Sequence, residues 1–415
     1  MDVTITPGRL RGSITPPPSK SQAHRLILAA ALSDGVSRIG NVAFSQDIRA
    51  TLSCAEALGA SWSEESPGCI RITGLMGPDN RPKKAFSALP RFDCGESGST
   101  LRFLIPIALA VAGGGVFTGR GRLMERPQKP YFDLFDAKGI AWRQEDGSLT
   151  VQGRLEPGRY TLPGDVSSQF FTGLLYALPL LSGESRLESA TPLESYGYIT
   201  MTLEALDAFR VNVEEEKEER PAFLIRPSAY ESRNCRVEAD WSQAAFWYAA
   251  IGLGSQLEVD GLNAFSSQGD MRIVPYYLKM RGRGPVELDA SQCPDLVPAL
   301  AVQAALRGGE HTRIVNAARL RIKESDRLSA VTAALGGLGA QIKEGPDFLS
   351  IQGVDHLSGG EADSFNDHRI AMMLAVAATR AEGPVTIRGA ECVAKSYPNF
   401  WEDYESVGGK LVRSN

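Results

Sequence analysis

Two kinds of helical segment alternate along the chain, and their alternation indicates a repeated architecture. Segments of the first kind begin with small polar or charged residues and continue as about three turns rich in Ala and Leu, with almost no polar face. A helix that is apolar around its whole circumference must be buried, so we expect these segments to form the core. They begin at Ser19, Ser97, Ser167, Ser242, Asp295 and Asp367.

Segments of the second kind have one apolar and one polar face, which is typical of a helix that covers a core. They end near Gly59, Gly139, Arg210, Gly282, Gly339 and Gly408. Both kinds recur roughly every 70 residues, and in both series one interval is shorter than the others. This period is too long for the common solenoid repeats, so each repeat is predicted to be a larger α/β element with two unlike helices.

Short apolar or alternating runs between the helices predict strands, because Gly, Pro or Asn bound them. They include "CIRITGL", "SLTVQG", "FLIRPS", "QLEVDGL" and "FLSIQGV". The predicted fold class is α/β, with six repeats in two similar domains of three. In one economical topology the amino-terminal strand joins the carboxyl-terminal domain. Residues 1–18 and 238–415 then form domain 1, and residues 19–237 form domain 2.

The composition argues against several classes of function. The formal net charge is −5 and there is no basic tail or stripe, so we expect no nucleic-acid partner. The apolar runs are too short to span a bilayer, and "MDVTITPGRL" lacks the features of a signal peptide, so we expect no membrane association. Six scattered cysteines without a CxxC pair favour reduced thiols in the cytoplasm, and the four histidines have no metal-binding spacing.

Signatures of several common enzyme classes are missing from the sequence. It contains no GxxxxGK[ST] loop, no strand-borne GxGxxG followed by an acid, no HExxH and no nucleophile elbow of the form Gx-Ser-x-Gly. Nucleotide-driven, metallopeptidase and esterase functions are therefore weakly supported.

The starts of the predicted helices carry the candidate chemistry. A helix amino terminus presents free N–H groups and a partial positive charge, which favour anions. A single Ser, Thr or Asp there is most simply a cap, as Ser325 is expected to be in "RIKESDR", but cations and hydroxyls gather at several starts. The candidates are Lys20, Arg25, Gly98, Ser99, Arg102, Ser167, Ser168, Gln169, His368 and Arg369 at helix starts, and Arg126, Lys323, Arg327 and Lys395 in loops.

If these junctions converge, they form a positive funnel for a small, multiply anionic ligand. Arg binds carboxylate and phosphate bidentately, whereas Lys acts as a point charge. Asp295 and Glu324 lie among these cations and are the acid/base candidates. His368 is a further candidate, although a single histidine beside an apolar run is more often structural.

A series of motifs, in order along the chain, resembles those of one enzyme family. They are "PPPSKSQAHR", "SGSTLR", "MERP", "GDVSSQF", "ESYGYI", "CPDLV", "RIKESDR", "NDHRIAM" and "AKSYPNF". On these motifs the chain resembles the 3-phosphoshikimate 1-carboxyvinyltransferases, also called 5-enolpyruvylshikimate-3-phosphate synthases, over essentially its full length. The resemblance implies two domains, each of three βαβαββ repeats, that close on an active site in the interdomain cleft.

The resemblance also implies a reaction. The enolpyruvyl group of phosphoenolpyruvate is transferred to the 5-hydroxyl of shikimate 3-phosphate, phosphate is released, and the product serves chorismate and aromatic amino-acid synthesis. No metal and no organic cofactor are implied, the expected partners are these two small substrates, and we expect a monomer. The family is the target of the herbicide glyphosate, which competes with phosphoenolpyruvate.

Residue roles follow from the resemblance, motif by motif. Lys20 is expected to touch both substrates and to take part in catalysis, and Gln169 to lie between the substrates. Asp295 is implied as the base on the attacking hydroxyl, and Glu324 as the group that moves the proton to and from the methylene carbon. The residues implied for shikimate 3-phosphate are Ser21, Arg25, Ser167, Ser168, Ser195, Tyr198, Asp295 and Lys323, and those for phosphoenolpyruvate are Gly98, Arg126, Arg327, Arg369 and Lys395.

Two positions depart from the family pattern. Glu96 stands where members often have Asn, so a carboxylate lies close to an expected anion site and is predicted to point away or to pair with a cation. Arg319 stands where many members have Asn, four residues before Lys323. Two alternative functions remain open, the UDP-N-acetylglucosamine enolpyruvyltransferases of the same fold and a non-catalytic anion-binding relative. The absence of a cysteine from "GRGRLMERP" disfavours the first alternative, and the intact acidic and basic residues disfavour the second.

Overall fold

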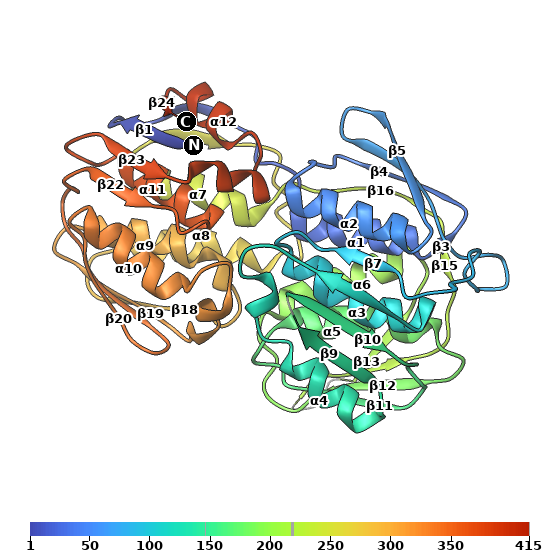
Figure 1. Ribbon diagram of the computed structural model, residues 1–415. Coiled ribbons are helices and arrows are strands. Elements are labelled where there is room, and N and C mark those ends of the chain that lie inside the picture. The colour runs from blue at the N-terminus through green and yellow to red at the C-terminus, as the bar shows by residue number, and fades with distance from the viewer. Residues whose placement is uncertain (146, 217–219, 415) are drawn as a thin grey trace. The chain divides into compact units, whose positions relative to one another are not determined.

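The computed structural model describes residues 1–145, 147–216 and 220–414, which form two compact units (Figure 1). Unit 1 consists of Met1–Ser19 and Ala239–Asn415, and unit 2 of Lys20–Glu238. The chain therefore passes between the units twice, after Ser19 and after Glu238. Each unit has a hydrophobic core of its own.

Unit 2 contains three four-stranded sheets with the same strand order. In each sheet the first two strands are parallel and the remaining pairs are antiparallel. The sheets are β16(Asn234–Arg236)-β4(Val36–Gly40)-β6(Cys69–Thr73)-β5(Ser61–Ser66), β7(Arg91–Asp93)-β8(Gly114–Thr118)-β10(Ser148–Gln152)-β9(Ala141–Glu145) and β11(Arg159–Leu162)-β12(Ser185–Ser189)-β14(Ala222–Ile225)-β13(Val213–Glu216). A short parallel pair joins β15(Tyr230–Glu231) to β3(Ser33–Asp34).

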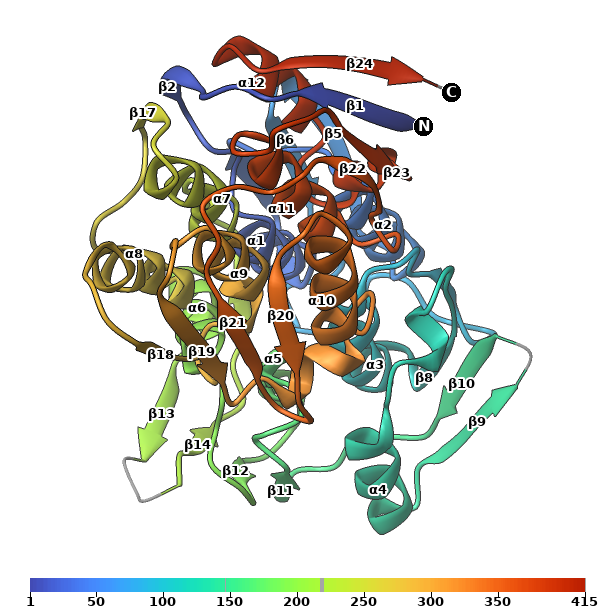
Figure 2. The ribbon, with the colours of Figure 1, turned by 90° about the vertical axis from the view of Figure 1, so that its left-hand side faces the viewer.

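Unit 1 repeats this sheet topology and includes the amino terminus. Its sheets are β22(Gly360–Asp363)-β23(Val385–Arg388)-β1(Asp2–Thr6)-β24(Lys410–Ser414), β18(Val286–Asp289)-β19(His311–Val315)-β21(Leu349–Gln352)-β20(Gln341–Glu344), and the parallel pair β17(Gln256–Val259)-β2(Arg11–Ile14). Strand β1 pairs antiparallel with both β23 and β24, and Figure 2 shows β1 beside β24 with both chain ends together. The first strand of the chain thus completes a sheet built from its last segment.

The predicted apolar helices form the core of each unit. They are α1(Lys20–Ala31), α3(Gly98–Ala112) and α5(Ser168–Ala177) in unit 2, and α7(Trp241–Gly252), α9(Val297–Ala305) and α11(His368–Ala378) in unit 1. Every residue of α9 and of α11 is buried, as expected for helices without a polar face. The predicted two-faced helices cover them, namely α2(Gln46–Ala57), α4(Lys129–Lys138), α6(Tyr196–Ala208), α8(Ile273–Arg281), α10(Arg327–Gly337) and α12(Phe400–Ser406).

Three of the predicted helix starts are displaced. Asp240 rather than Ser242 caps α7, because its carboxylate accepts a hydrogen bond from the N–H of Gln243 at 3.0 Å. Asp326 rather than Ser325 caps α10 in the same way. Asp295 lies in a 3-10 turn, η4(Pro294–Leu296), that precedes α9. In each case a carboxylate lies at the junction where a hydroxyl or a regular helix start was expected.

Three further properties bear on function. None of the described helices is long and apolar enough to cross a membrane. Within the same described part of the chain, no three His, Cys, Asp or Glu side chains are grouped so that they could hold a metal ion. The six cysteines are free thiols.

Candidate active site

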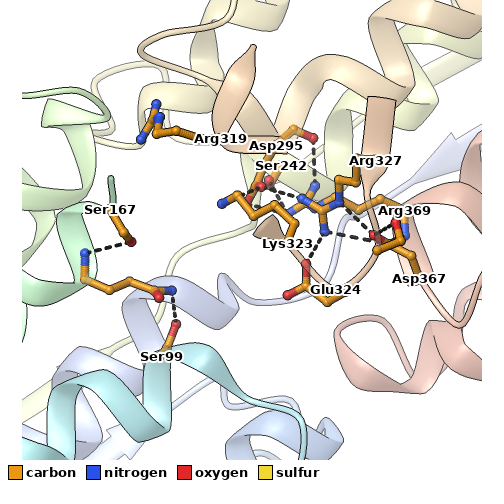
Figure 3. A network of polar contacts seen from close by, with 12 residues as sticks. Ser99, Ser167, Ser242, Asp295, Arg319, Lys323, Glu324, Arg327, Asp367 and Arg369 are labelled. Carbon is orange, nitrogen blue, oxygen red and sulfur yellow. Dashed lines mark hydrogen bonds and ion pairs between the residues drawn. The ribbon is translucent and has the colours of Figure 1, made fainter. Parts of the chain in front are cut away.

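Arg327 is the centre of the charged cluster in unit 1 (Figure 3). It is the first residue of α10, and only 1% of its side chain is exposed. Its guanidinium donates hydrogen bonds from Nε to Asp367 at 2.8 Å, from Nη1 to Asp295 at 2.8 Å and from Nη2 to Glu324 at 2.6 Å. Burial alone lowers the pKa of Arg327, but the three carboxylates raise it above its ordinary value. The planar guanidinium therefore stays charged and orients all three acids.

Arg369 is a second cation on the same carboxylate. Its Nη2 donates to Asp295 Oδ2 at 3.1 Å and to Ser242 Oγ at 2.8 Å, and its Nη1 donates to the main-chain carbonyl of Asp295 at 3.1 Å. Asp367 caps α11 by accepting a hydrogen bond from the N–H of Arg369 at 3.0 Å. Residues from α7, η4, α10 and α11 thus meet around Asp295.

The protonation of Asp295 and Lys323 is set by this environment. Lys323 Nζ lies 3.6 Å from Asp295 Oδ1. Burial raises the pKa of Asp295, but the surrounding cations, with Arg369 the strongest, hold it well below its ordinary range. Burial is the main cause that lowers the pKa of Lys323 to about 8, and the charges of Arg327 and Arg319 add to the effect. Asp295 is consequently an anion at neutral pH, while Lys323 can gain or lose a proton close to neutral pH.

Lys395 and His368 lie at the same junction of unit 1. Lys395 is 4% exposed, and its Nζ donates to the main-chain carbonyl of Asn366 at 2.7 Å. His368 is 2% exposed, with Nδ1 4.0 Å from Asp367 Oδ1. His368 and Lys395 are therefore both held against the start of α11.

Lys20 begins the polar cluster of unit 2. It is the first residue of α1, and its Nζ contacts Asp47 Oδ2 at 2.7 Å. Asp47 lies in the first turn of α2, and both side chains are largely buried. The sequence interpretation did not include Asp47, although an acid in the first turn after a Ser cap is a recognisable signal of a charge held at a helix start.

Arg25 is the most enclosed cation of unit 2, with 2% of its surface exposed. Its Nε donates to Thr202 Oγ1 at 2.9 Å, its Nη2 to the carbonyl of Tyr198 at 2.9 Å and its Nη1 to the carbonyl of Ser21 at 2.7 Å. Burial lowers its pKa to about 10. Arg25 thus links α1 to α6, whose start, Ser195, is also buried and has a left-handed backbone with φ 55°.

Gln169 connects the starts of two buried helices of unit 2. Its Oε1 accepts from Arg102 Nη1 at 2.9 Å, its Nε2 donates to Ser99 Oγ at 3.0 Å, and its N–H donates to Ser167 Oγ at 3.3 Å. Figure 3 shows Ser99 and Ser167 at the two ends of this link. Ser168 is the first residue of α5 and is 5% exposed. The predicted residues of "SGSTLR" and "GDVSSQ" therefore belong to one hydrogen-bonded group.

Gly98 lies where an added side chain would meet the guanidinium of Arg126. A Cβ at Gly98 would lie 2.9 Å from Arg126 Nη1 and 3.1 Å from Arg126 Cζ, closer than such atoms approach one another. The guanidinium of Arg126, which is 6% exposed, therefore rests directly on the start of α3. This contact brings a cation to a helix amino terminus. An anion there is favoured both by the charge of the guanidinium and by the free N–H groups and dipole of the helix.

The two departures from the family pattern have defined surroundings. Glu96 packs on Gly121, since a Cβ on Gly121 would come within 2.6 Å of Glu96 Oε2. Arg319 is 8% exposed, and its Nη2 donates to the main-chain carbonyl of Ser291. Figure 3 shows the Arg319 guanidinium lying apart from the cluster around Arg327. Arg319 therefore adds its charge to that cluster from a distance.

Two side chains of the unit 1 cluster, Asp367 and Ser242, were not among the predicted site residues. Asp367 is completely buried and accepts hydrogen bonds from both Arg327 and Ser325. Its place before an apolar helix in "NDHR" is a capping signal that could have identified it. Ser242 contacts Arg369, which lies 127 residues further along the chain, and no local pattern reports such a contact.

Comparisons with known proteins place the chain in a family. A model of the family described as EPSP synthase (3-phosphoshikimate 1-carboxyvinyltransferase) matches residues 5–404. The 3-phosphoshikimate 1-carboxyvinyltransferase of Clostridium perfringens is 45% identical over 429 residues, which cover 99% of each chain. That of Clostridium kluyveri is 44% identical over 428 residues, which cover 99% of this chain and 98% of the relative.

Solved structures show the same fold. An EPSP synthase from Acinetobacter baumannii superimposes with a TM-score of 0.79 at 25% identity and covers 99% of this chain and 100% of its own. The enolpyruvyl transferase NikO from Streptomyces tendae has the same architecture, with a TM-score of 0.76 at 17% identity over 100% of this chain and 98% of its own. The predicted fold class is confirmed by these likenesses.

Proposed function

The chain belongs to the EPSP synthase (3-phosphoshikimate 1-carboxyvinyltransferase) family, and from that premise we propose how its residues divide the work of the reaction. The reaction transfers the enolpyruvyl group of phosphoenolpyruvate to the 5-hydroxyl of shikimate 3-phosphate and releases phosphate, in aromatic biosynthesis. The resemblance drawn from the motifs is thereby confirmed. The division among residues, the place of the site, the monomeric state and the cytoplasmic location are our proposals.

The cluster around Arg327 performs the chemistry. Glu324 protonates the methylene carbon of phosphoenolpyruvate, which makes the neighbouring carbon cation-like, and the 5-hydroxyl attacks that carbon while Asp295 accepts its proton. The tetrahedral adduct then loses phosphate, which takes up the hydroxyl proton held by Asp295, and Glu324 takes one methyl proton back. Arg327 supports this assignment because it touches both acids at 2.6 and 2.8 Å and fixes their relative position.

The low pKa of Asp295 fits this role once the substrate is bound. In the free protein Arg369 and the other cations make Asp295 a weak base. The carboxylate and phosphate of phosphoenolpyruvate engage Arg369, and their negative charge offsets its field. The basicity of Asp295 therefore rises when phosphoenolpyruvate binds. Lys323, with a pKa lowered to about 8, is mostly protonated at neutral pH and places its ammonium beside Asp295, where it stabilises the carboxylate.

The cations on phosphoenolpyruvate come from both units. We assign Arg369, Arg327 and Lys395 of unit 1 and Arg126 of unit 2 as these cations, with Gly98 beside Arg126 as a further contact of this substrate. Two anionic substrates repel one another, so these cations offset the Coulomb cost of bringing them together and stabilise the leaving phosphate.

The hydroxyl and amide groups of unit 2 hold shikimate 3-phosphate. Ser167 and Ser168, at the start of α5, bind its phosphate, where the N–H groups of the helix add to the hydroxyls. Hydrogen bonds to Arg102 and Ser99 fix the amide of Gln169, which we assign to a place between the two substrates. The remaining ligands assigned to this substrate are Lys20, Ser21, Arg25, Ser195 and Tyr198, with Asp295 and Lys323 at its ring.

A phosphate-release assay tests the function as a whole. Purified protein with phosphoenolpyruvate and shikimate 3-phosphate is expected to release phosphate, and UDP-N-acetylglucosamine in place of shikimate 3-phosphate is expected to give none. Phosphate release with UDP-N-acetylglucosamine alone would assign the chain to the other enolpyruvyl transfer reaction. No release with either acceptor would favour the non-catalytic alternative.

Because the assigned ligands come from both units, we propose that the substrates bind in a cleft between them and that binding draws the units together. Closure expels water and strengthens every electrostatic interaction in the site. Small-angle X-ray scattering is expected to give a smaller radius of gyration with saturating shikimate 3-phosphate. An unchanged scattering profile at saturation would contradict closure.

A further inference from the structure

Asp270 is a buried carboxylate that the reaction described above does not use. It lies in a 3-10 turn, η3(Gly269–Arg272), between β17 and α8, and is 3% exposed. The neighbouring Gln268 holds this turn against the start of α7, since its Nε2 donates to the carbonyl of Ala239 at 2.8 Å and its Oε1 accepts from the N–H of Trp241 at 3.1 Å. Asp270 is therefore placed by the fold rather than by a loose loop.

The partner of Asp270 is Ser242, in the first turn of α7, which is hydrogen-bonded to it. Ser242 Oγ also accepts a hydrogen bond from Arg369 Nη2 at 2.8 Å, and Figure 3 shows Ser242 beside Asp295 and Arg369. A serine hydroxyl has one proton to donate and two lone pairs. When its proton goes to Asp270, both lone pairs remain available for the guanidinium.

Two carboxylates hold the guanidinium of Arg369 in different ways. Asp295 contacts the guanidinium directly, at 3.1 Å, but in the proposed reaction it is also the base that accepts the proton of the substrate hydroxyl. Asp270 acts on the guanidinium indirectly, through Ser242, and its protonation state does not change during the reaction. A carboxylate that accepts the serine proton polarises the hydroxyl and strengthens its bond to a cation.

We propose that Asp270 is a positioning residue, which through Ser242 holds the guanidinium of Arg369 in the orientation that binds phosphoenolpyruvate. This inference rests on the proposed role of Arg369. It adds a residue that touches neither substrate and that keeps one edge of the guanidinium anchored while the other edge faces the ligand. The planar fork of Arg loses affinity for a carboxylate or phosphate when its plane is free to rotate.

The surroundings of Asp270 shift its pKa into a pH range in which enzyme activity can be measured. Burial is the main cause that raises the pKa of Asp270 to about 6, the charges of Asp295 and Asp240 add to it, and Arg369 opposes it. Cys293 also faces this carboxylate, and Asp270 contributes to the raised pKa of that thiol. Above about pH 6 Asp270 is ionised and accepts the serine proton. Below that pH it is neutral and donates to Ser242 instead, which reverses the link.

A double-mutant cycle tests the proposal on the full-length protein. Ser242→Ala and Asp270→Ala are each expected to raise the KM for phosphoenolpyruvate about tenfold, the size of one lost hydrogen bond to a charged group. Because the two residues act in series, the double variant is expected to show about the same tenfold rise rather than about a hundredfold. The KM for shikimate 3-phosphate and kcat are expected to stay within about twofold of wild type.

A structural role alone would give a different pattern. If Asp270 only stabilises unit 1, its variants lower the melting temperature and affect the KM values of both substrates alike. Asp403→Asn is the control, because Asp403 is a second carboxyl of unit 1 with a raised pKa, half-buried and hydrogen-bonded to Tyr397 at 2.7 Å. This control is expected to leave both KM values unchanged.

Asp270→Asn keeps the shape of the side chain and an acceptor for Ser242, so it remains informative if Asp270→Ala does not fold. The ratio of kcat/KM for phosphoenolpyruvate between wild type and Asp270→Asn is expected to fall towards one below about pH 6, where both side chains are neutral. The ionisation of the substrate phosphates is common to both proteins and cancels in this ratio. A ratio that does not vary with pH would overturn the proposal, as would additive effects in the double variant.

The fate of the inference can be separated from that of the proposed function. If the wild-type protein releases no phosphate, the proposed function fails and the inference fails with it. If Arg369→Lys raises the KM for phosphoenolpyruvate while Ser242→Ala and Asp270→Ala leave it unchanged, only the inference is overturned.

Discussion

The polar clusters of the two units are built from different chemistry. In unit 1, cations and carboxylates alternate, and Arg327 alone contacts three acids. In unit 2, apart from the Lys20–Asp47 pair, the partners of the cluster around Gln169 are neutral. Arg102 donates to the amide of Gln169 and to a main-chain carbonyl, and Gln169 bonds to the hydroxyls of Ser99 and Ser167. Alternating charges shift pKa values, whereas hydroxyls and amides fix shape without titrating. This difference fits the proposed division of roles, in which unit 1 carries the proton transfers and unit 2 holds shikimate 3-phosphate.

The largest expected effect comes from removing the proton carrier of unit 1. Glu324→Gln keeps the shape of the side chain but cannot carry a proton, so kcat is expected to fall by about a thousandfold. Calorimetric titration is expected to show that the variant still binds shikimate 3-phosphate. Glu344→Gln is a suitable control, because Glu344 contacts Arg321 and Ser329 at the surface of the same unit. Turnover by Glu324→Gln within tenfold of wild type would reject the proton role.

The next largest effect is a difference in the free energy of unfolding between variants of two buried arginines, Arg327 and Arg102. Arg327→Met removes the buried cation that contacts Asp295, Glu324 and Asp367 and is expected to lower the free energy of unfolding by about 3–5 kcal/mol. Arg102→Met removes bonds to an amide and a carbonyl, both neutral, and is expected to cost about 1–2 kcal/mol. Urea denaturation of the two variants measures the difference. Equal losses would show that the two clusters do not differ in charge as described.

A smaller effect, on the KM for phosphoenolpyruvate, is expected from a change at Gly98, which unit 2 is proposed to contribute to this substrate. Gly98→Ala places a methyl group against the guanidinium of Arg126, which must move, so the KM for phosphoenolpyruvate is expected to rise about tenfold. The KM for shikimate 3-phosphate is expected to change little. Gly337→Ala is the matched control, since nothing lies within 4 Å of a Cβ there and the backbone is helical. A parallel rise in both KM values would indicate a general distortion of α3.

The smallest effect concerns the pH dependence of unit 1. Lys323 is protonated below a pKa of about 8, so activity that depends on its ammonium is expected to decline above that pH. Lys323→Arg keeps the positive charge to higher pH and is expected to move the alkaline limb of kcat upward. Profiles of kcat against pH for both proteins measure this shift. An alkaline limb at the same pH in the variant would assign it to another group.

The repeated architecture could be predicted from the sequence because it rests on local patterns. The apolar segments from Ser97, Ser167 and Asp367 became buried helices with the predicted caps, since capping and amphipathicity are set by neighbouring residues. The start predicted at Ser242 was wrong by two residues, because a carboxylate at Asp240 caps α7 in its place.

The network inside the site could be predicted only in part. The motifs named Arg327 and Arg369, but which acceptors these guanidinium groups meet depends on contacts between distant helices. Ser242 and Arg369 are separated by 127 residues, and the contact between them exists only because α7 and α11 pack together in unit 1. Asp270 had no motif at all. Its importance follows from burial and from its neighbours, which one sequence does not display.

The proton path assigned to Glu324 is the central claim, and isotope incorporation tests it most directly. In D₂O, protonation of phosphoenolpyruvate gives a methyl group that mixes one deuteron with two protons before one of the three is lost. Mass spectrometry of the product of the wild-type reaction is therefore expected to find deuterium in its methylene group. In Glu324→Gln, the rate of product formation and the rate of deuterium exchange into phosphoenolpyruvate are expected to fall together. Deuterium-free product from the wild type, or undiminished exchange in Glu324→Gln, would contradict the account.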